Sequence, residues 1–261
     1  MYEPYEIDIS EKFLKEILKR IDGKICLLGG WATYYIVNEN FEAATGRRYV
    51  GSRDIDIGFH IDKNWTVEEL KNSEFSNALH LLEEMRFRWV SFRFFKEFDR
   101  DTGRELTPEE SAELPLYKIF QLFVDPIVDN IHSKFRELFG FTPIDEPLLS
   151  YVFADGSFVK AKLFQVEVMM PRPHLLLAMK LNSVIHRDKE YKRMKDISDI
   201  YALLWFSDVR IGELKKGLFS IYPSEKARKT IMSFTENEIK RVSNAIGVTE
   251  EEIKRVLAEL K

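Results

Sequence analysis

The segment from Asp54 to Ile61 constrains the fold of this chain more than any other. Its residues alternate between two faces, with Ile55, Ile57, Phe59 and Ile61 on one face and Asp54, Asp56, Gly58 and His60 on the other. A period of two is typical of a β-strand that is buried on one side only. We therefore expect a half-buried strand whose open face carries two carboxylates, about 6.6 Å apart along the chain. The plain alternative is a solvated strand face without a function.

A second apolar segment, Ile25 to Leu28, runs directly into Gly29-Gly30. We expect a short buried strand, a glycine turn and then a helix from Trp31 to Val37. Glycines have no Cβ atom, so backbone N–H groups can approach a phosphate, and the positive end of a helix dipole favours an anion there. Taken alone, the glycines are better explained as an ordinary tight turn. Beside an Asp-x-Asp strand, they indicate phosphate binding.

A third acid follows in the β-rich segment from Tyr117 to Val128. Two carboxylates at positions i and i+2 of a strand repel each other unless a cation lies between them, and Mg²⁺ binds through few carboxylates together with substrate phosphates. In two-metal sites, ions about 3.5–4 Å apart activate the attacking oxygen and stabilise the leaving one. Asp129 is an alternative third ligand, but Pro126 would end the strand just after Asp125. We therefore expect a two-metal Mg²⁺ site held by Asp54, Asp56 and Asp125.

The remaining pattern divides the chain near Pro171. Helices are expected at 9–21 and 67–85, a strand at 87–98, and a hairpin of 149–153 with 158–169 about Asp155-Gly156. From Pro171 onward only helices are indicated. We therefore predict an α/β (α+β) fold in which a mixed-sheet catalytic domain, residues 1–170, precedes a helical C-terminal domain, residues 171–261.

Charge and composition bound the class of protein. The net charge of −4 over 261 residues is the sum of −9 for residues 1–170 and +5 for residues 171–261. The single cysteine, Cys26, excludes an internal disulfide framework and a cysteine-rich zinc site. The first residues do not resemble a secretory signal, and no apolar run approaches the ~20 residues of a membrane span. We expect a cytoplasmic protein, and the 31% charged content with only two glutamines resembles a thermophile's composition.

Together these motifs resemble the nucleotidyltransferase superfamily, in which a hydrophobic strand ends in Gly-Gly or Gly-Ser, and an Asp-x-Asp strand and a third acid follow. In this chain the corresponding residues are Leu27-Leu28-Gly29-Gly30, Asp54-Ile55-Asp56 and Asp125. More narrowly, Leu28-Gly29-Gly30-Trp31-Ala32 with Gly51-Ser52-Arg53-Asp54 is similar to the AbiEii toxin branch. That branch also has a helix bearing a lysine, here Lys180, followed by a Lys-Asp-x-x-Asp helix, here Lys195-Asp196-Ile197-Ser198-Asp199.

The resemblance implies an enzyme that takes an NTP such as ATP, transfers the nucleoside monophosphate to an acceptor hydroxyl and releases pyrophosphate. It implies that Asp54, Asp56 and Asp125 bind the metal and act in catalysis, with Asp125 helping to activate the hydroxyl. Lys180 would neutralise phosphate charge as a further catalytic residue. Contacts to the nucleotide are expected from Gly29, Gly30, Ser52, Lys180, Asp196 and Asp199.

The AbiEii branch implies an RNA acceptor, tRNA in particular, and a cognate antitoxin as partner. The basic charge of residues 171–261 agrees with RNA binding. Two other functions remain open: transfer to a small hydroxylated molecule, as in antibiotic-modifying relatives, and a catalytically silent nucleotide-binding module. The Lys-Asp-x-x-Asp motif also has a plain alternative, because Lys192 with Asp196 and Lys195 with Asp199 have the i, i+4 spacing of surface ion pairs.

Overall fold

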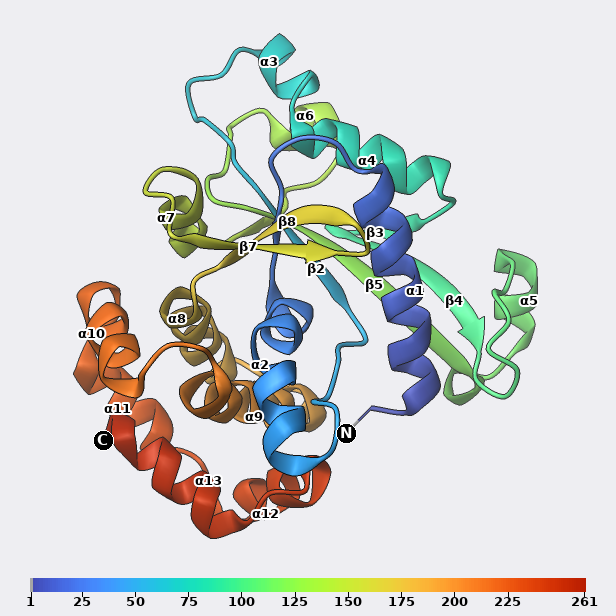
Figure 1. Ribbon diagram of the computed structural model, residues 1–261. Helices are drawn as coiled ribbons and strands as arrows, with labels where there is room; N and C mark the ends of the chain where they lie inside the picture. The colour runs from blue at the N-terminus through green and yellow to red at the C-terminus, as the bar shows by residue number, and fades with distance from the viewer. Residues whose placement is uncertain (1) are drawn as a thin grey trace. The chain divides into compact units, whose positions relative to one another are not determined.

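The computed structural model describes residues 2–261, and its backbone contacts group these residues into two units. The sheet unit contains residues 2–28 and 52–170, and the helical unit contains residues 29–51 and 171–261 (Figure 1). Residues 29–51 therefore group with the C-terminal helices, although they lie within the 1–170 segment of the sequence analysis.

The sheet unit is built on one mixed sheet, as the sequence predicts. Its strands are β1 (Cys26–Leu27), β2 (Ile55–Phe59), β3 (Arg88–Val90), β4 (Arg93–Asp99), β5 (Ile119–Val128), β6 (Ile144–Asp145), β7 (Phe158–Leu163) and β8 (Val166–Pro171). The strand order is β3-β4-β5-β2-β1-β8-β7, and β6 pairs with β5. The β2–β5 and β1–β8 pairs are parallel, whereas the β1–β2 and β4–β5 pairs are antiparallel.

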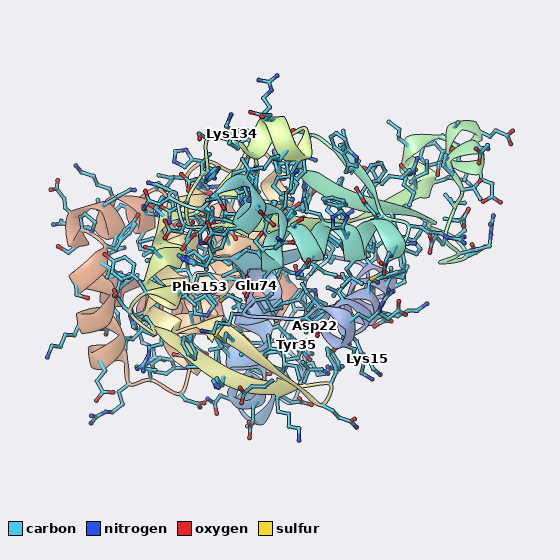
Figure 2. All side chains as sticks on the ribbon, turned by 90° about the horizontal axis from the view of Figure 1, so that it is seen from above. Lys15, Asp22, Tyr35, Glu74, Lys134 and Phe153 are labelled. Carbon is cyan, nitrogen blue, oxygen red and sulfur yellow. The ribbon has the colours of Figure 1, made fainter. Side chains whose placement is uncertain are left out.

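The helices of the sheet unit are α1 (Pro4–Arg20), α3 (Val67–Lys71), α4 (Glu74–Glu84), α5 (Pro108–Glu113), α6 (Phe135–Phe139) and α7 (Ser150–Phe153). Helix α1 contacts β5 and α4. It begins well before the expected residue 9, because Pro4 occupies its first turn and the Glu6 carboxylate accepts the N–H of Glu3 at 3.3 Å. It ends before Gly23, whose φ of +92° favours glycine and where an added Cβ would lie 2.3 Å from Glu74 Cγ. Figure 2 labels Glu74 and Asp22, the residue before this glycine.

Two expected elements are subdivided. The helix expected at 67–85 breaks between α3 and α4, because Thr66 and Ser73 each cap a new helix through a side-chain oxygen. The strand expected at 87–98 is the hairpin of β3 and β4, whose two-residue turn contains Ser91 in a positive-φ conformation.

The hairpin expected about Asp155-Gly156 is wrong. The segment before it forms a 3₁₀ turn at Pro147–Leu149 and then α7. Leu149 and Val152 are both buried at helical i, i+3 spacing, so a helix fits this segment better than a strand. The true hairpin joins β7 and β8 through Phe164-Gln165, both of which have positive φ, as a type I′ turn requires.

The helical unit consists of α2 (Gly29–Thr45), α8 (Pro173–Val184), α9 (Glu190–Phe206), α10 (Ile211–Ile221), α11 (Ser224–Met232), α12 (Glu236–Ile246), α13 (Glu250–Leu257) and a 3₁₀ turn at Ala258–Leu260. Helix α9 is its centre: residues 195–204 are all buried, and the helix packs against α2, α8, α12 and α13. Beyond β8 the described chain has no strand, which confirms the helical C-terminal part. Within residues 2–261, no helix combines the length and the apolar character that a membrane crossing requires.

Candidate functional site

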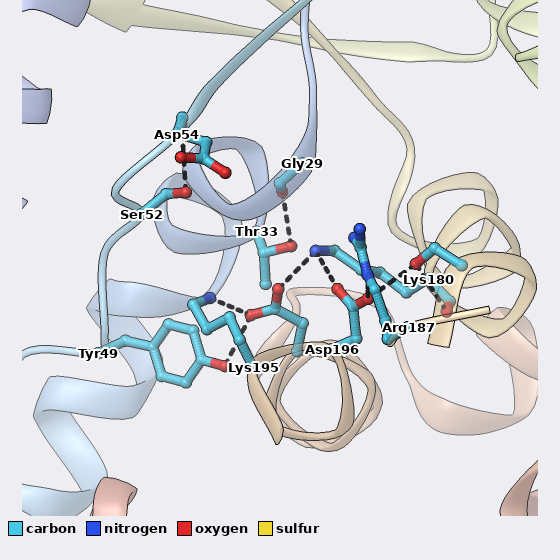
Figure 3. Close-up of polar contacts among 11 residues, drawn as sticks. Gly29, Thr33, Tyr49, Ser52, Asp54, Lys180, Arg187, Lys195 and Asp196 are labelled. Atoms are coloured by element: carbon cyan, nitrogen blue, oxygen red, sulfur yellow. Dashed lines mark hydrogen bonds and ion pairs between the residues drawn. The ribbon is translucent and has the colours of Figure 1, made fainter. Parts of the chain in front are cut away.

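The parallel pairing of β2 with β5 brings the predicted acids together. Asp56 on β2 is the register partner of Asp125 on β5, and Asp54 immediately precedes β2. The end of β1 is tied to the same place, because the N–H of Leu28 donates to the Asp56 carbonyl at 2.9 Å. Ser52, expected to contact phosphate, donates its hydroxyl to the Asp54 carbonyl at 2.9 Å (Figure 3). The two-strand origin of the acids is therefore as expected.

A basic residue that the sequence analysis did not single out lies among these acids. Arg93, the first residue of β4, donates from Nε and Nη2 to the two carboxylate oxygens of Asp125 at 2.6 and 2.8 Å. Its Nη2 also lies 3.5 Å from Asp54 Oδ2, and its guanidinium carbon lies 3.9 Å from the centroid of the Phe123 ring. Strands β4 and β5 are antiparallel, and Phe94 pairs with Val124. The preceding residue of β4, Arg93, therefore lies opposite the following residue of β5, Asp125. We call Asp54, Asp56, Asp125 and Arg93 the aspartate cluster.

The electrostatics of the aspartate cluster show an excess of negative charge. Burial raises the pKa of Asp125 to about 7, and the charges of Asp56 and Asp54 act in the same direction. Arg93 opposes these effects but does not cancel them. Burial by itself would lower the pKa of Arg93, yet Asp125 and its two neighbouring aspartates raise it. Burial and the neighbouring carboxylates together therefore disfavour the ionised form of Asp125.

A divalent cation suits the donor chemistry of the aspartate cluster. Its carboxylates are hard oxygen ligands of the kind that Mg²⁺ binds, and two of them already approach one cationic group. Among residues 2–261, however, no three His, Cys, Asp or Glu side chains are arranged as a ready metal site. The guanidinium of Arg93 lies among the carboxylates, so metal binding by Asp54, Asp56 and Asp125 requires Arg93 to move.

The alternative third acid, Asp129, is engaged elsewhere. Its carboxylate accepts the N–H of Ile61 at 2.8 Å and bonds His60 Nδ1 at 2.6 Å. Between this pair and the aspartate cluster lies Gly58, where a Cβ would come within 2.8 Å of the Leu149 side chain. His60 is thus partnered with Asp129 rather than with the Asp54–Asp56 strand end. The geometry favours Asp125 over Asp129 as the third acid.

The reason given above for preferring Asp125 is wrong, because Pro126 does not end the strand. Strand β5 continues to Val128, and Pro126 is the register partner of Ile57. The pairing with β4 stops at Val124, and the pairing with β6 begins only at Ile127. Pro126 therefore occupies a position where one side of β5 has no neighbouring strand to receive its missing N–H, as a proline in a sheet requires.

The predicted phosphate-binding glycines open a long helix. Helix α2 starts at Gly29 itself, with φ of +61°, and runs to Thr45, past the expected end at Val37. Gly29 and Gly30 contribute backbone N–H groups from the first turn, where a helix leaves its donors without partners within the helix. The carbonyl of Gly29 accepts the Thr33 hydroxyl at 3.1 Å. This N-terminus has the form that anion binding needs.

The lysine and aspartates of the second motif lie inside the helical unit (Figure 3). Lys180 Nζ lies 2.9 Å from Asp196 Oδ1 and 2.7 Å from Asp199 Oδ2. Lys195 pairs with Asp199, and Arg187 Nε lies 2.6 Å from Asp196 Oδ2. We call these five residues the lysine-aspartate network. The i, i+4 pair of Lys195 with Asp199 is therefore present but buried, and Asp196 bonds Lys180 and Arg187.

Charges within the lysine-aspartate network compensate one another. Burial would raise the pKa of Asp196, but Lys180 and Arg187 outweigh it and lower the pKa to about 2. Burial likewise opposes the charge of Lys180, yet Asp196 and Asp199 raise its pKa. For Lys195 burial prevails and lowers the pKa. Asp196 and Lys180 are therefore both ionised at neutral pH and bonded to each other.

Comparison with known proteins gives a distant structural likeness. No family model matches the chain, and no curated protein matches it. Among solved structures, the chain is similar to the crystal structure of an antigenic nucleotidyltransferase-like protein from Paracoccidioides brasiliensis. The two share 14% sequence identity with a TM-score of 0.38, over 92% of each chain.

Proposed function

We propose that this chain is a Mg²⁺-dependent nucleotidyltransferase of the AbiEii type, which transfers a nucleoside monophosphate from an NTP to the hydroxyl of an RNA, with release of pyrophosphate. The observation that carries the proposal is the convergence of Asp54, Asp56 and Asp125, from two adjacent parallel strands, beside the end of the strand that leads into Gly29. Acids in this order after a strand and two glycines are the motif of the superfamily that the sequence resembles.

Each part of the aspartate cluster has a defined task in this proposal. Asp54, Asp56 and Asp125 would hold the metal ions, which supply a charge for the phosphate oxygens and lower the pKa of a bound hydroxyl. Asp125, on the strand adjacent to Asp56, would help to accept the proton of the acceptor hydroxyl. The N–H groups at the start of α2 and the hydroxyl of Ser52 would bind phosphate oxygens.

The proposed acceptor is RNA, tRNA in particular, and the proposed partner is an antitoxin. Both follow from the AbiEii motif, and the +5 charge of residues 171–261 supports a polyanionic acceptor. Lys180, Asp196 and Asp199 stay predicted contributors to the reaction. Their mutual ion pairs make them residues that shape the helical unit, and any contact of Lys180 with phosphate would have to compete with two carboxylates.

The test is a transfer assay with each of the four labelled NTPs, Mg²⁺ and total RNA or tRNA. Wild type is expected to label RNA, and the Asp54→Asn/Asp56→Asn variant is expected to label none while keeping its thermal midpoint. Replacing RNA by small polyhydroxylated compounds tests the alternative acceptor. Equal labelling by wild type and variant would refute the proposed enzyme.

A nucleotide-binding module without activity has its own signature. Because the aspartates would then have no reaction to serve, a nucleotide would raise the thermal midpoint of wild type and of the Asp54→Asn/Asp56→Asn variant alike, and no acceptor would be labelled. Salt dependence separates the acceptors, since the affinity for RNA falls steeply as counterions compete, whereas that for a neutral small molecule does not.

A further inference from the structure

We propose that Arg93 is a built-in competitor of the divalent cation: its guanidinium holds Asp125 and approaches Asp54, so metal binding in the absence of nucleotide is weak and requires Arg93 to leave. The inference deepens the proposed function, on which it rests through the metal-binding role of the aspartates. It assigns a role to a residue that the sequence motif does not include.

Arg93 contacts two of the three proposed metal ligands, Asp125 and Asp54. A guanidinium offers a planar fork of donors that matches a carboxylate, and Arg93 uses two donors on the two oxygens of Asp125 at 2.6 and 2.8 Å. A metal ion bound to Asp125 would need one or both of these oxygens. The third contact, 3.5 Å from Arg93 Nη2 to Asp54 Oδ2, reaches another expected metal ligand. One side chain thus occupies two of the three proposed ligands.

The strand register and an aromatic ring hold Arg93 in this position. The cross-strand register sets it opposite Asp125, and the Phe123 ring, 3.9 Å from its guanidinium carbon, supports the cation from one side. Its side chain remains 22% exposed, against 9% for that of Asp125. Arg93 also directly follows the two-residue turn that joins the edge strand β3 to β4. The buried acid is fixed, whereas the arginine has a route to solvent.

A phosphate group offers Arg93 an alternative partner to Asp125. An NTP brings phosphate oxygens, which guanidinium groups bind in the same two-pronged manner as carboxylates. When the nucleotide and the divalent ion arrive together, Arg93 can exchange Asp125 for a phosphate, so that no charge is left without a partner. Metal binding is therefore expected to be coupled to nucleotide binding, and coupled binding is reciprocal.

The chain supplies a matched control in Arg88. It lies on the same hairpin, pairs with the carboxylate of Glu97 and stacks over the Phe95 ring with its guanidinium carbon 4.7 Å from the centroid. Arg88 therefore reproduces the chemistry of Arg93, an arginine between a carboxylate and an aromatic ring, but its acid is not one of the predicted metal ligands. Loss of Arg88 should affect the hairpin and not the metal.

The experiment titrates the 261-residue chain with Mn²⁺, without nucleotide and at one pH and ionic strength. Calorimetry and electron paramagnetic resonance measure the binding. Arg93→Gln is expected to bind Mn²⁺ at least tenfold more tightly than wild type, and Arg88→Gln to bind it as wild type does. Saturating Mn²⁺ should raise the thermal midpoint of Arg93→Gln more than that of wild type. Equal Mn²⁺ affinity of Arg93→Gln and wild type would overturn the proposal.

Two further variants locate the ion and guard against misfolding. Adding Asp56→Asn to Arg93→Gln should abolish the gain in affinity; a retained gain would mean that the ion binds elsewhere, and the proposal would fall. Arg93→Lys keeps a positive charge but lacks the planar fork of donors that matches the two Asp125 oxygens. Its Mn²⁺ affinity should lie between those of wild type and Arg93→Gln, and an affinity no higher than that of wild type would count against the competition.

The outcome is separable from that of the transfer assay, because Mn²⁺ binding needs neither nucleotide nor acceptor. If Arg93→Gln gains Mn²⁺ affinity and wild type labels no acceptor, the competition stands and the proposed reaction fails. If wild type labels RNA and Arg93→Gln gains no Mn²⁺ affinity, the reaction stands and the competition fails.

Discussion

The aspartate cluster of the sheet unit and the lysine-aspartate network of the helical unit are built from the same ionic groups with opposite results. In the network, three cations bond two aspartates, and the pKa of Asp196 falls to about 2. In the cluster, Arg93 bonds Asp125 and approaches Asp54, and the pKa of Asp125 rises to about 7. Burial acts on both acids in the same direction, so the balance of neighbouring charge decides the sign.

This difference separates an interior that is complete from a site that needs a ligand. Buried charges persist in proteins when they are paired and hydrogen-bonded, and the network satisfies that condition within the helical unit. An excess of buried carboxylates is costly to the fold and is found where function requires it. The cluster is therefore the better candidate for chemistry, and the network the better candidate for stability.

The largest expected difference between the cluster and the network is in the rate of nucleotide transfer. If Asp125 accepts the acceptor proton, Asp125→Asn should lower the rate of nucleotide transfer by about 10²–10⁴-fold. The matched change in the network, Asp199→Asn, should lower the rate per folded molecule far less, because Asp199 is bonded to Lys180, Lys195 and Tyr49 of the helical unit. Steady-state labelling of RNA, normalised to folded protein by circular dichroism, checks both. Equal losses in the two variants would contradict the division of roles.

The next effect concerns stability. Lys180→Met leaves Asp196 and Asp199 with one cation fewer in a fully buried setting, where removing one partner of an ion pair costs about 3–5 kcal/mol. Arg93→Gln should cost less, because Asp125 can take up a proton near neutral pH and so avoid a buried charge. Urea unfolding at pH 7 measures both variants. A larger loss for Arg93→Gln than for Lys180→Met would reverse the comparison.

The sequence predicts the aspartate cluster better than the network because the two depend on different information. Alternation along β2 sets Asp54 and Asp56 on one face, and a strand of its own carries Asp125. Arg93 could not be assigned, because its place depends on the register between β4 and β5, which pairs residues about 30 positions apart. Strand alternation over 87–98 gives its face but not its partner.

The burial of the lysine-aspartate network likewise could not be predicted from the local sequence. The spacing of Lys195 and Asp199 indicates an i, i+4 pair, and that pair exists, but spacing does not say whether the helix face meets water or other helices. Helix α9 is enclosed by α2, α8, α12 and α13, so its polar residues are buried with its apolar ones. The same limit explains why the strand prediction for residues 149–153 is wrong, because a short apolar run fits a strand and a helix alike.

The contributions of Asp196 and Asp125 to the stability of the fold should change in opposite directions with pH. The folded-state pKa of Asp196 is lowered, so its contribution, about 2 kcal/mol, is present above pH 4 and lost as the pH falls towards 2. The folded-state pKa of Asp125 is raised, so the folded state holds a proton that the unfolded state releases, and stability falls as the pH rises from about 4 to 7.

Asparagine variants make these trends measurable by urea unfolding between pH 3 and pH 8. The deficit of Asp196→Asn relative to wild type should shrink below pH 4. The stability of Asp125→Asn relative to wild type should increase from pH 4 to pH 7 and then level off. Parallel pH profiles for the two variants would show that the charge balance of the two regions is alike.

The smallest expected effect tests whether the network acts as one unit. The Tyr49 hydroxyl donates to Asp199 Oδ1 at 2.9 Å, and the Ser183 hydroxyl donates to Asp196 Oδ2 at 2.9 Å. Tyr49→Phe and Ser183→Ala should each cost about 1 kcal/mol, the usual net value of one hydrogen bond. The two bonds lie on different acids, but both acids share Lys180.

The double variant should therefore depart from additivity by about 0.5 kcal/mol or more, as residues of one ion-pair network do. Loss of either hydroxyl leaves more of the Lys180 charge to the affected carboxylate, which changes what the other hydroxyl contributes. Urea unfolding of the four proteins of the cycle at pH 7 gives the coupling energy. Strict additivity would mean that Asp196 and Asp199 belong to two separate ion pairs. The network and the aspartate cluster would then differ only in the number of their charged groups.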